Sequence, residues 1–176
     1  MSIINQIKCL TEVQIMREEI LSLLEKNSEM SAESIAETLG VSAEAVAAEI
    51  KKMEEEKVIC GYSAIVNWDK TERRYVTALI EVRVTPQRGD GFDRIADRIL
   101  RFPEVKAVYL MSGGFDLTVI VEGKDIKEVA FFVSDKLSTI NAVIGTATHF
   151  VLKNYKDHGV VMGQNLKSDE RMIVSP

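Results

Sequence analysis

Residues that commonly staple small proteins or hold metal ions are scarce in this chain of 176 residues, which has two cysteines and two histidines. Cys9 and Cys60 are far apart and match no metal-binding or redox spacing. His149 and His158 form no ligand set with cysteines or carboxylates. Apolar runs are also short, such as residues 129–133, whereas a membrane-spanning helix needs about 20 residues. We therefore expect no metal, no cofactor and no membrane span.

Signatures of catalysis and export are also absent from the sequence. It contains no Gly-x-Ser-x-Gly elbow, no phosphate-cradling loop and no Rossmann glycine pattern. No histidine lies near either cysteine in the sequence to activate a thiol. The first residues lack the basic segment and apolar core of a secretory signal. We expect a cytoplasmic protein that is not an enzyme.

Negative charge is present in excess and is unevenly distributed. The chain carries a net charge of −5, and residues 1–62 hold twelve glutamates against six lysines and arginines. The remaining residues carry a net charge close to zero. Because nucleic acids are bound largely through neutralisation of their phosphates, residues 1–62 are expected to bind DNA weakly at physiological salt.

The N-terminal part nevertheless has the pattern of a helix-turn-helix. Apolar residues recur at helical spacing over residues 11–27, and further helices are expected at 32–39 and 43–57. A short turn joins the last two. The stretch 58–68 is rich in β-forming residues and is expected to form a wing. Residues suited to helix caps stand at the predicted ends: Ser31, Gly40 and Ser42.

The periodicity changes after the polar run 69–74. Apolar and polar residues alternate from residue 75 to 85, which is typical of a strand. Helix, strand, strand, helix and strand patterns follow in that order: 92–99, 105–111, 115–122, 126–137 and 143–152. The order βαββαβ is that of a ferredoxin-like split unit.

These patterns predict an α+β protein with two domains. A winged helix-turn-helix is expected at residues 1–68 and a linker at 69–74. A second domain, of ferredoxin-like fold, is expected at 75–156. Residues 157–176 form a tail without assigned structure.

The ordered set of segments resembles the Lrp/AsnC family of regulators. The run Ser31–Val46, SAESIAETLGVSAEAV, is similar to the helix-turn-helix of that family, and Lys52–Tyr62, KMEEEKVICGY, to the segment leading into the wing. Gly113–Asp116 and Thr146–Thr148 are similar to the hairpin and the last strand of the effector domain. The resemblance covers about residues 11–156.

The resemblance implies an amino-acid-responsive, DNA-binding transcription regulator. It implies homodimers joined through the effector-domain sheets, often assembled into octamers, with a small effector bound between neighbouring dimers. By position, several residues match sites of the family's response to effector: Leu110, Gly113, Asp116, His149, Phe150 and Val151.

The residues themselves suggest how an amino acid could be held. Glycines let a ligand approach the backbone closely, so that amides can donate to a carboxylate, and Asp116 would balance an α-ammonium group. Thr146 and Thr148 share one face of a strand and carry hydroxyls. A tight turn, a solvated aspartate and strand-forming threonines are alternative interpretations. The candidate effector residues are Leu110, Gly113, Gly114, Phe115, Asp116, Thr146, Thr148 and His149.

The third predicted helix would read DNA, because the second helix of a helix-turn-helix enters the major groove. Its core face is expected to hold Val46, Ile50 and Met53. Family members commonly carry a basic residue at the position of Glu49, which is expected to face outward and repel phosphate. An effector-binding oligomer that has lost DNA binding and acts through protein partners is therefore the alternative. The candidate DNA-contacting residues are Ser42, Ala45, Ala48, Glu49, Lys51 and Lys52.

Overall fold

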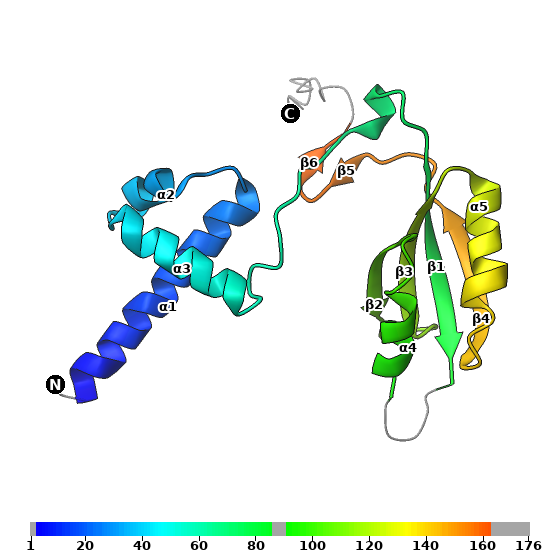
Figure 1. Ribbon diagram of the computed structural model, residues 1–176, viewed down its shortest axis with the longest axis horizontal. Coiled ribbons are helices and arrows are strands. Elements are labelled where there is room, and N and C mark those ends of the chain that lie inside the picture. The colour runs from blue at the N-terminus through cyan, green and yellow to red at the C-terminus, as the bar shows by residue number, and fades with distance from the viewer. Residues whose placement is uncertain (1–2, 86–90, 163–176) are drawn as a thin grey trace, which may run out of the picture. The chain divides into compact units, whose positions relative to one another are not determined.

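The chain forms two compact units, Met1–Ala64 and Ile65–Pro176. The computed structural model describes residues 3–85 and 91–162, with side chains described from residue 13 onward. One unit is built from helices and the other around a sheet (Figure 1). The division precedes the polar run 69–74, so that this run lies inside the second unit.

The first unit contains three helices: α1 (Ile3–Lys26), α2 (Ala32–Leu39) and α3 (Ala43–Glu55). α1 begins before the predicted residue 11, and α2 has the predicted bounds. The apolar stripes of the helices meet in a core: Ile20, Leu24, Ile35, Ala36, Val46 and Met53. The predicted helix-turn-helix is therefore confirmed.

Capping residues set the turn between α2 and α3. Ser31 Oγ accepts a hydrogen bond from the backbone N–H of Ser34 (3.3 Å), and Ser42 Oγ accepts one from that of Ala45 (3.2 Å). Gly40 ends α2 with a φ of 69°, a left-handed conformation that glycine adopts without a steric penalty. Because each cap depends on neighbouring residues only, the local sequence determines this turn.

The predicted wing at residues 58–68 does not form. The chain turns at Lys57 (φ 61°), and the backbone N–H of Val58 donates to the carbonyl of Met53 (2.9 Å). Residues 58–67 contain no strand, and a 3-10 turn, η1 (Trp68–Lys70), follows. β-forming side chains produce a strand only where a neighbouring strand pairs with them. In the described part of the chain this segment has no such neighbour, and the wing prediction was wrong.

The second unit contains a four-stranded antiparallel sheet with the strand order β2-β3-β1-β4. Its strands are β1 (Val76–Val84), β2 (Val105–Leu110), β3 (Leu117–Gly123) and β4 (Val143–Phe150). Helical segments connect them: α4 (Asp93–Ile99), α5 (Ile126–Phe131) and the π-helical segment η2 (Phe132–Leu137). This order confirms the predicted βαββαβ arrangement.

The core of the second unit lies between the helices and one face of the sheet (Figure 1). Every second residue of β1 from Ala78 to Val84 is buried, as the alternation predicted. Ile99 and Leu137 of the helical layer are also buried. Antiparallel partners share a face, so the pairing register assigns a set of residues to the opposite face: Thr77, Leu79, Glu81, Ala107, Tyr109, Thr118, Ile120, Ala147 and His149.

A short hairpin follows the sheet and extends into the tail, residues 157–176, for which the sequence predicted no structure. It pairs β5 (Lys156–Asp157) with β6 (Val160–Val161). His158 and Gly159 both have positive φ (43° and 83°), as a two-residue hairpin turn requires. The side-chain amide of Asn67 donates to the carbonyl of Met162, which attaches the hairpin to the start of the second unit.

Candidate functional site

α3 presents two different faces to its surroundings. Val46 and Met53 are fully buried against the other helices, and Ile50 packs beside them, as predicted. The opposite side of the helix and the preceding cap are exposed, including five of the candidate DNA-contacting residues: Ser42, Ala45, Ala48, Lys51 and Lys52. Their exposure agrees with the helical periodicity from which they were selected.

Glu49, the remaining candidate, does not face outward. Its side chain is 12% exposed, and its Oε1 lies 3.2 Å from Nε of Arg17 on α1. The prediction that Glu49 projects into solvent was wrong, because the position lies at the edge between the buried and exposed faces of α3. A charged residue there is drawn toward a partner on α1, and the α3 sequence alone does not show that partner.

Arg17 also links α1 to the end of α3. Its guanidinium donates a hydrogen bond to Oε2 of Glu56, the residue that follows the helix. This bond raises the pKa of Arg17 and lowers that of Glu56. Lys52 Nζ lies 3.9 Å from the other Glu56 oxygen. Two of the glutamates near α3 therefore have a cation beside them, and the negative charge at this end of the helix is locally offset.

The β2–β3 turn is held against the end of β1 by Asp116. Its backbone N–H donates to the carbonyl of Val82 (3.0 Å), and its Oδ2 accepts a hydrogen bond from the N–H of Val84 (2.8 Å). The regular β1–β3 pairing stops at Val82. The Asp116 carboxylate therefore takes the place of a backbone acceptor and extends the contact along β1 from Val82 to Val84.

Gly113 and Gly114 are exposed at this turn, and neither has a positive φ. A Cβ added to either glycine would meet nothing within 4 Å. The interpretation that the turn conformation requires both glycines therefore loses its support. What they provide is a stretch of backbone that no side chain covers.

The remaining effector candidates lie on both faces of the sheet. Thr146 and Thr148 pair with Val82 and Ile80, so they share the helix-facing side and are half-buried. His149 points to the other face, with its Nε2 3.2 Å from Oε1 of Glu81. Because Val82 pairs with Leu117 on one side and Thr146 on the other, the hairpin and Thr146 flank β1 at the same end of the sheet. Leu110 and Phe115 belong to that hairpin, whereas His149 lies apart.

Comparison with known proteins covers both units. The chain matches the AsnC-type helix-turn-helix domain over residues 18–54 and the Lrp/AsnC ligand binding domain over residues 77–161. The HTH-type transcriptional regulator YugG of Bacillus subtilis (strain 168) is 50% identical over 159 residues, which are 90% of this chain and 95% of that protein. The chain belongs to the Lrp/AsnC family. It is a transcription regulator with a helix-turn-helix DNA-binding domain and a ligand-binding domain, as the resemblance implied.

Other Lrp/AsnC proteins are more distant. The proline dehydrogenase transcriptional activator of Rhodobacter capsulatus is 31% identical over 134 residues, which are 76% of this chain and 86% of that protein. Escherichia coli AsnC has the same fold, with a TM-score of 0.59 and 22% identity over 79% of this chain and 91% of that chain. So does the Neisseria meningitidis regulator NMB0573 solved with L-Met, with a TM-score of 0.64 and 21% identity over 81% and 91%.

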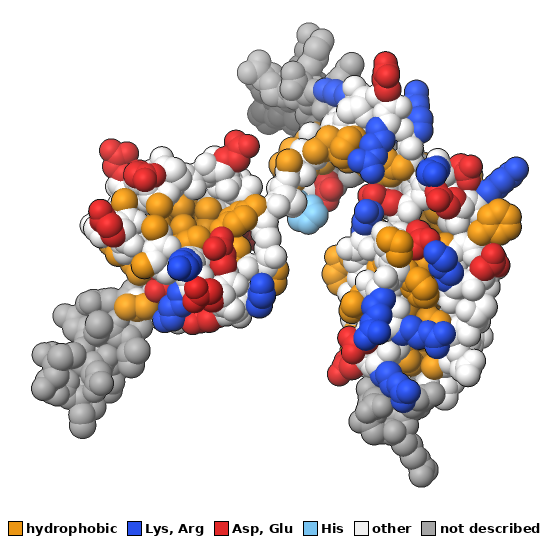
Figure 2. Space-filling view, in the orientation of Figure 1, with side chains coloured by type: hydrophobic (Ala, Val, Ile, Leu, Met, Phe, Trp, Pro, Cys, Tyr) orange, Lys and Arg blue, Asp and Glu red, His pale blue; other side chains and the backbone are white. Residues whose placement is uncertain are grey.

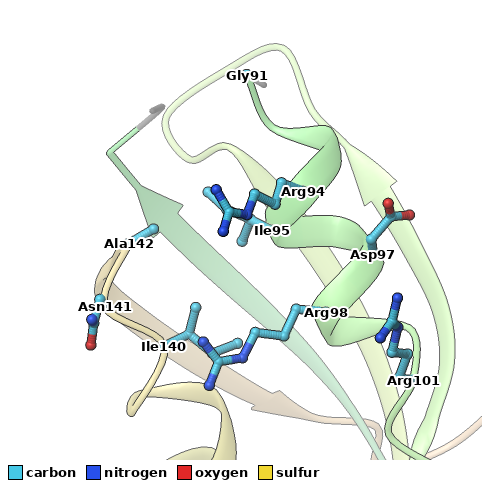
Figure 3. Close-up of a pocket in the computed structure, with 9 residues that line it drawn as sticks. All are labelled: Gly91, Arg94, Ile95, Asp97, Arg98, Arg101, Ile140, Asn141 and Ala142. Atoms are coloured by element: carbon cyan, nitrogen blue, oxygen red, sulfur yellow. The ribbon is translucent and has the colours of Figure 1, made fainter. Parts of the chain in front are cut away.

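The structure of this Lrp/AsnC regulator also contains a pocket that the sequence analysis missed. Its volume is about 430 Å³, and it lies between α4 and the segment that precedes β4 (Figure 3). No candidate effector residue lines it; its walls are Gly91, Arg94, Ile95, Asp97, Arg98, Arg101, Ile140, Asn141 and Ala142. The spacing of the arginines along α4 was the available signal, since residues four apart share a helix face.

Neither a membrane-spanning helix nor a metal cluster occurs in the described structure. None of the helices within residues 3–85 and 91–162 is long and apolar enough to cross a membrane. The same residues contain no group of three His, Cys, Asp or Glu side chains placed to hold a metal ion.

Proposed function

We propose that this regulator responds to an amino acid that binds at the hairpin end of the sheet and thereby changes its action on DNA in the cytoplasm. The observation that carries the proposal is the uncovered backbone of Gly113 and Gly114 beside the carboxylate of Asp116. The relative from Neisseria meningitidis was solved with L-Met, which supports an amino acid as the class of effector.

The proposed contacts follow from the chemistry of an amino acid. The amides of Gly113 and Gly114 would donate to the α-carboxylate, while Oδ1 of Asp116 would accept from the α-ammonium group. Oδ2 of Asp116 is already bonded to Val84, which fixes the orientation of the carboxylate. The other candidates would hold the effector side chain through hydroxyl and apolar contacts: Leu110, Phe115, Thr146 and Thr148. His149 lies on the other sheet face and is left out of this site.

The proposed DNA contacts lie on the exposed side of α3. Ala45 and Ala48 would face the bases, because their small side chains permit close approach and apolar contact with thymine methyl groups. Lys51 and Lys52 would contact phosphate, and Ser42 would lie at the helix start, where backbone amides favour an anion. Glu49 is left out of this surface, because it is paired with Arg17.

We further propose that the protein acts as a homodimer or higher oligomer joined through the sheet face opposite the helices. Tyr109 on that face is 56% exposed, and Leu79 lies half-exposed at its centre. Such a surface is less apolar than a core but more apolar than a strand face that remains in water, which suits a second sheet.

A glycine substitution tests the effector site without disturbing the fold. In the variant Gly114→Val the added Cβ would meet nothing within 4 Å, so the melting temperature should stay close to that of the wild type. The side chain would cover the backbone amides and should abolish the melting shift that the best of the 20 L-amino acids produces. Gly61→Val is the matched control, because that glycine also has open space around it and lies in the other unit. An unchanged amino-acid response in Gly114→Val would contradict the proposed site.

A further inference from the structure

The segment that joins the two units is short, because a side-chain hydrogen bond holds the chain on each side of it. The boundary between the units falls after Ala64, and residues 63–66 around it are exposed. Among the residues that the structure describes, 63–65 take part in no hydrogen bond. We call residues 63–66 the connector.

Tyr62 holds the beginning of the connector on α3. Its hydroxyl donates to Oε1 of Glu54, in the last turn of that helix (2.8 Å). The backbone N–H groups of Val58 and Ile59 both donate to the carbonyl of Met53 (2.9 and 3.1 Å). Ile59 also packs against the core of the first unit. The chain up to Tyr62 therefore belongs to the body that carries the DNA-reading helix.

Asn67 holds the end of the connector on the C-terminal hairpin, which lies beside this segment in Figure 1. Its amide donates to the carbonyl of Met162, and the Met162 N–H donates to the carbonyl of Tyr155 across the hairpin (2.9 Å). Figure 2 shows apolar side chains gathered over this region, where Val160 and Val161 remain exposed while Met162 is buried. The contact at Met162 is therefore the one that joins the hairpin to the connector.

The hairpin is in turn attached to the sheet. The chain enters it from β4, and the backbone pairing of β4 with β1 extends to Val151, whose N–H donates to the carbonyl of Thr77 (2.9 Å). Near the start of β1, the guanidinium of Arg73 lies 4.6 Å from the ring centre of Trp68 and 5.5 Å from that of Tyr75. The second anchor is therefore fixed to the sheet unit from two sides.

The reach of so short a connector limits what the regulator can read. Five residues, the number from Tyr62 to Asn67, span at most about 18 Å when fully extended. One helical turn of DNA is about 34 Å long, so lengthening a two-part site by one turn moves each half outward by about 17 Å. That distance uses nearly the whole length of an extended connector. Two anchored subunits therefore cannot follow half-sites that are one turn too far apart.

We propose that Tyr62 and Asn67 are positioning residues for DNA reading, which limit the half-site spacing that the regulator accepts. Tyr62 acts through α3, and Asn67 acts through the hairpin. The proposal rests on the homodimer proposed above and is independent of the amino-acid site. Release of both anchors lengthens the free connector, which lowers the effective concentration at the preferred spacing and makes longer spacings accessible.

Conservative substitutions release the anchors one by one. Tyr62→Phe removes only the hydroxyl donor, and Asn67→Asp replaces the amide donor by a carboxylate that faces the carbonyl of Met162. Glu54→Gln keeps an acceptor for Tyr62 and is the control for the first anchor. Asn154→Asp makes the same charge change at an exposed position and is the control for the second. All of these proteins should melt close to the wild-type temperature.

Limited proteolysis with elastase tests the anchors in the free full-length protein. Elastase cleaves after small apolar residues, which Ala64 and Val66 provide. Because cleavage requires an open segment, the double variant Tyr62→Phe/Asn67→Asp should be cut at the connector at least tenfold faster than the wild type. Mass spectrometry of the fragments should locate the added cleavage at the connector alone, which distinguishes release of the anchors from general unfolding. An unchanged rate would contradict the anchoring.

A DNA site selected by the wild type from random duplexes tests the effect on reading. Fluorescence anisotropy compares this site with a copy that carries one helical turn, about 10 base pairs, inserted at its centre. The wild type and both control variants should lose at least tenfold in affinity on insertion. The double variant should lose less than threefold.

Equal dependence on the insertion in the wild type and the double variant would overturn the proposal. If the affinity of the double variant fell by the same factor for both sites, the anchors would have a structural role only. Light scattering of the same samples separates the two levels of failure. A monomeric wild type would refute the homodimer, whereas a dimer with unchanged spacing dependence would refute the role of the anchors.

Discussion

At the scale of single residues, the ion pair between Arg17 and Glu49 changes the interpretation of the acidic helix. Glu49 seemed from its position to oppose DNA, but in the structure it holds α1 against α3. Arg17 and Glu49 are 18% and 12% exposed, so both charges are largely withdrawn from water. Removing one partner would leave the other in a poorly solvated place.

Glu49→Arg should therefore lower the melting temperature by several degrees, because two guanidinium groups would then face each other. Combining it with Arg17→Glu should restore much of the loss by reversing the pair. The control is Glu37→Arg, an exposed position on α2 where the same substitution should change stability little. Thermal denaturation of the wild type and of these three variants gives the comparison. A Glu49→Arg protein with wild-type stability and raised DNA affinity would contradict the structural role of the Arg17–Glu49 pair.

The bond between Arg17 and Glu56 also predicts a dependence on pH. The pKa of Glu56 is lowered in the folded protein by the hydrogen bond from Arg17, so its contribution is present above the pKa of the unfolded chain. That contribution disappears as the pH falls from the ordinary glutamate pKa of about 4.3 through the lower pKa of the folded protein. The variant Glu56→Gln has no carboxyl group to protonate at this position. Its melting temperature should therefore fall less steeply than that of the wild type over the same pH range. Parallel plots of melting temperature against pH for the wild type and Glu56→Gln would refute a stabilising role of the Glu56 carboxylate.

At the scale of elements, the β2–β3 hairpin and the end of β1 depend on one another. The Val84 N–H, at the irregularity in the β1–β4 pairing, has the Asp116 carboxylate as its acceptor. A substitution of Asp116 is therefore expected to affect both the strand end and the proposed effector site.

Two substitutions of Asp116 separate its structural hydrogen bond to Val84 from the role of its negative charge in amino-acid binding. Asp116→Ala should cost about 1–3 kcal/mol of unfolding free energy, because the buried Val84 donor loses its acceptor. Asp116→Asn keeps an acceptor oxygen and should retain most of the stability, while losing at least tenfold in amino-acid affinity. Denaturant unfolding and calorimetric titration measure the two effects. Wild-type affinity in the Asn variant would show that the charge takes no part in binding.

The exposed face of α3 makes a second prediction at this scale. Lys51→Gln should weaken binding to all DNA sequences alike and reduce the slope of log affinity against log salt by about one, as expected for one lost phosphate contact. The control Lys127→Gln makes the same charge change on α5, in the other unit, and should leave the slope unchanged. Equal effects of both variants would show that net charge, and not this helix face, governs DNA binding.

At the scale of the whole molecule, the two units differ in charge and in the surfaces they leave uncovered. Most of the excess acidity belongs to residues 1–62. Within the described part of the second unit, the helices cover one face of the sheet and leave the other face without a helical layer. We therefore expect the protein to function as an oligomer whose subunits are joined through this sheet face.

A lysine on the open sheet face tests that association. Ala147 is exposed on β4 opposite Glu81, so Ala147→Lys can pair across the strands and preserve the sheet while introducing a charge into the proposed interface. This variant should be a monomer by light scattering at micromolar concentration, where the wild type is at least a dimer. Ala130→Lys, exposed on α5, is the matched control and should remain associated. A monomeric wild type would rule out the interface.

Local chemistry in the sequence was sufficient for the elements themselves. The serine caps, the left-handed Gly40 and the helical spacing of apolar residues lie within a few residues of the structure that they determine. The alternation along β1 likewise predicted which side chains are buried. These features need no knowledge of distant contacts, and for that reason the helix-turn-helix and the βαββαβ order could be predicted.

Contacts between distant segments were decided only by the tertiary structure. Glu49 turned inward because Arg17, 32 positions earlier, lies beside it. The stretch 58–67 stayed without a strand because β-forming residues need a pairing partner, which its own sequence cannot supply. The pocket joins α4 to residues 140–142, more than 40 positions apart. The sequence determined the helices with their caps and the order of the paired strands. Packing determined whether a β-forming segment found a partner strand and which side chains would meet, because strand pairing, charge pairing and cavity shape arise only where separate segments come together.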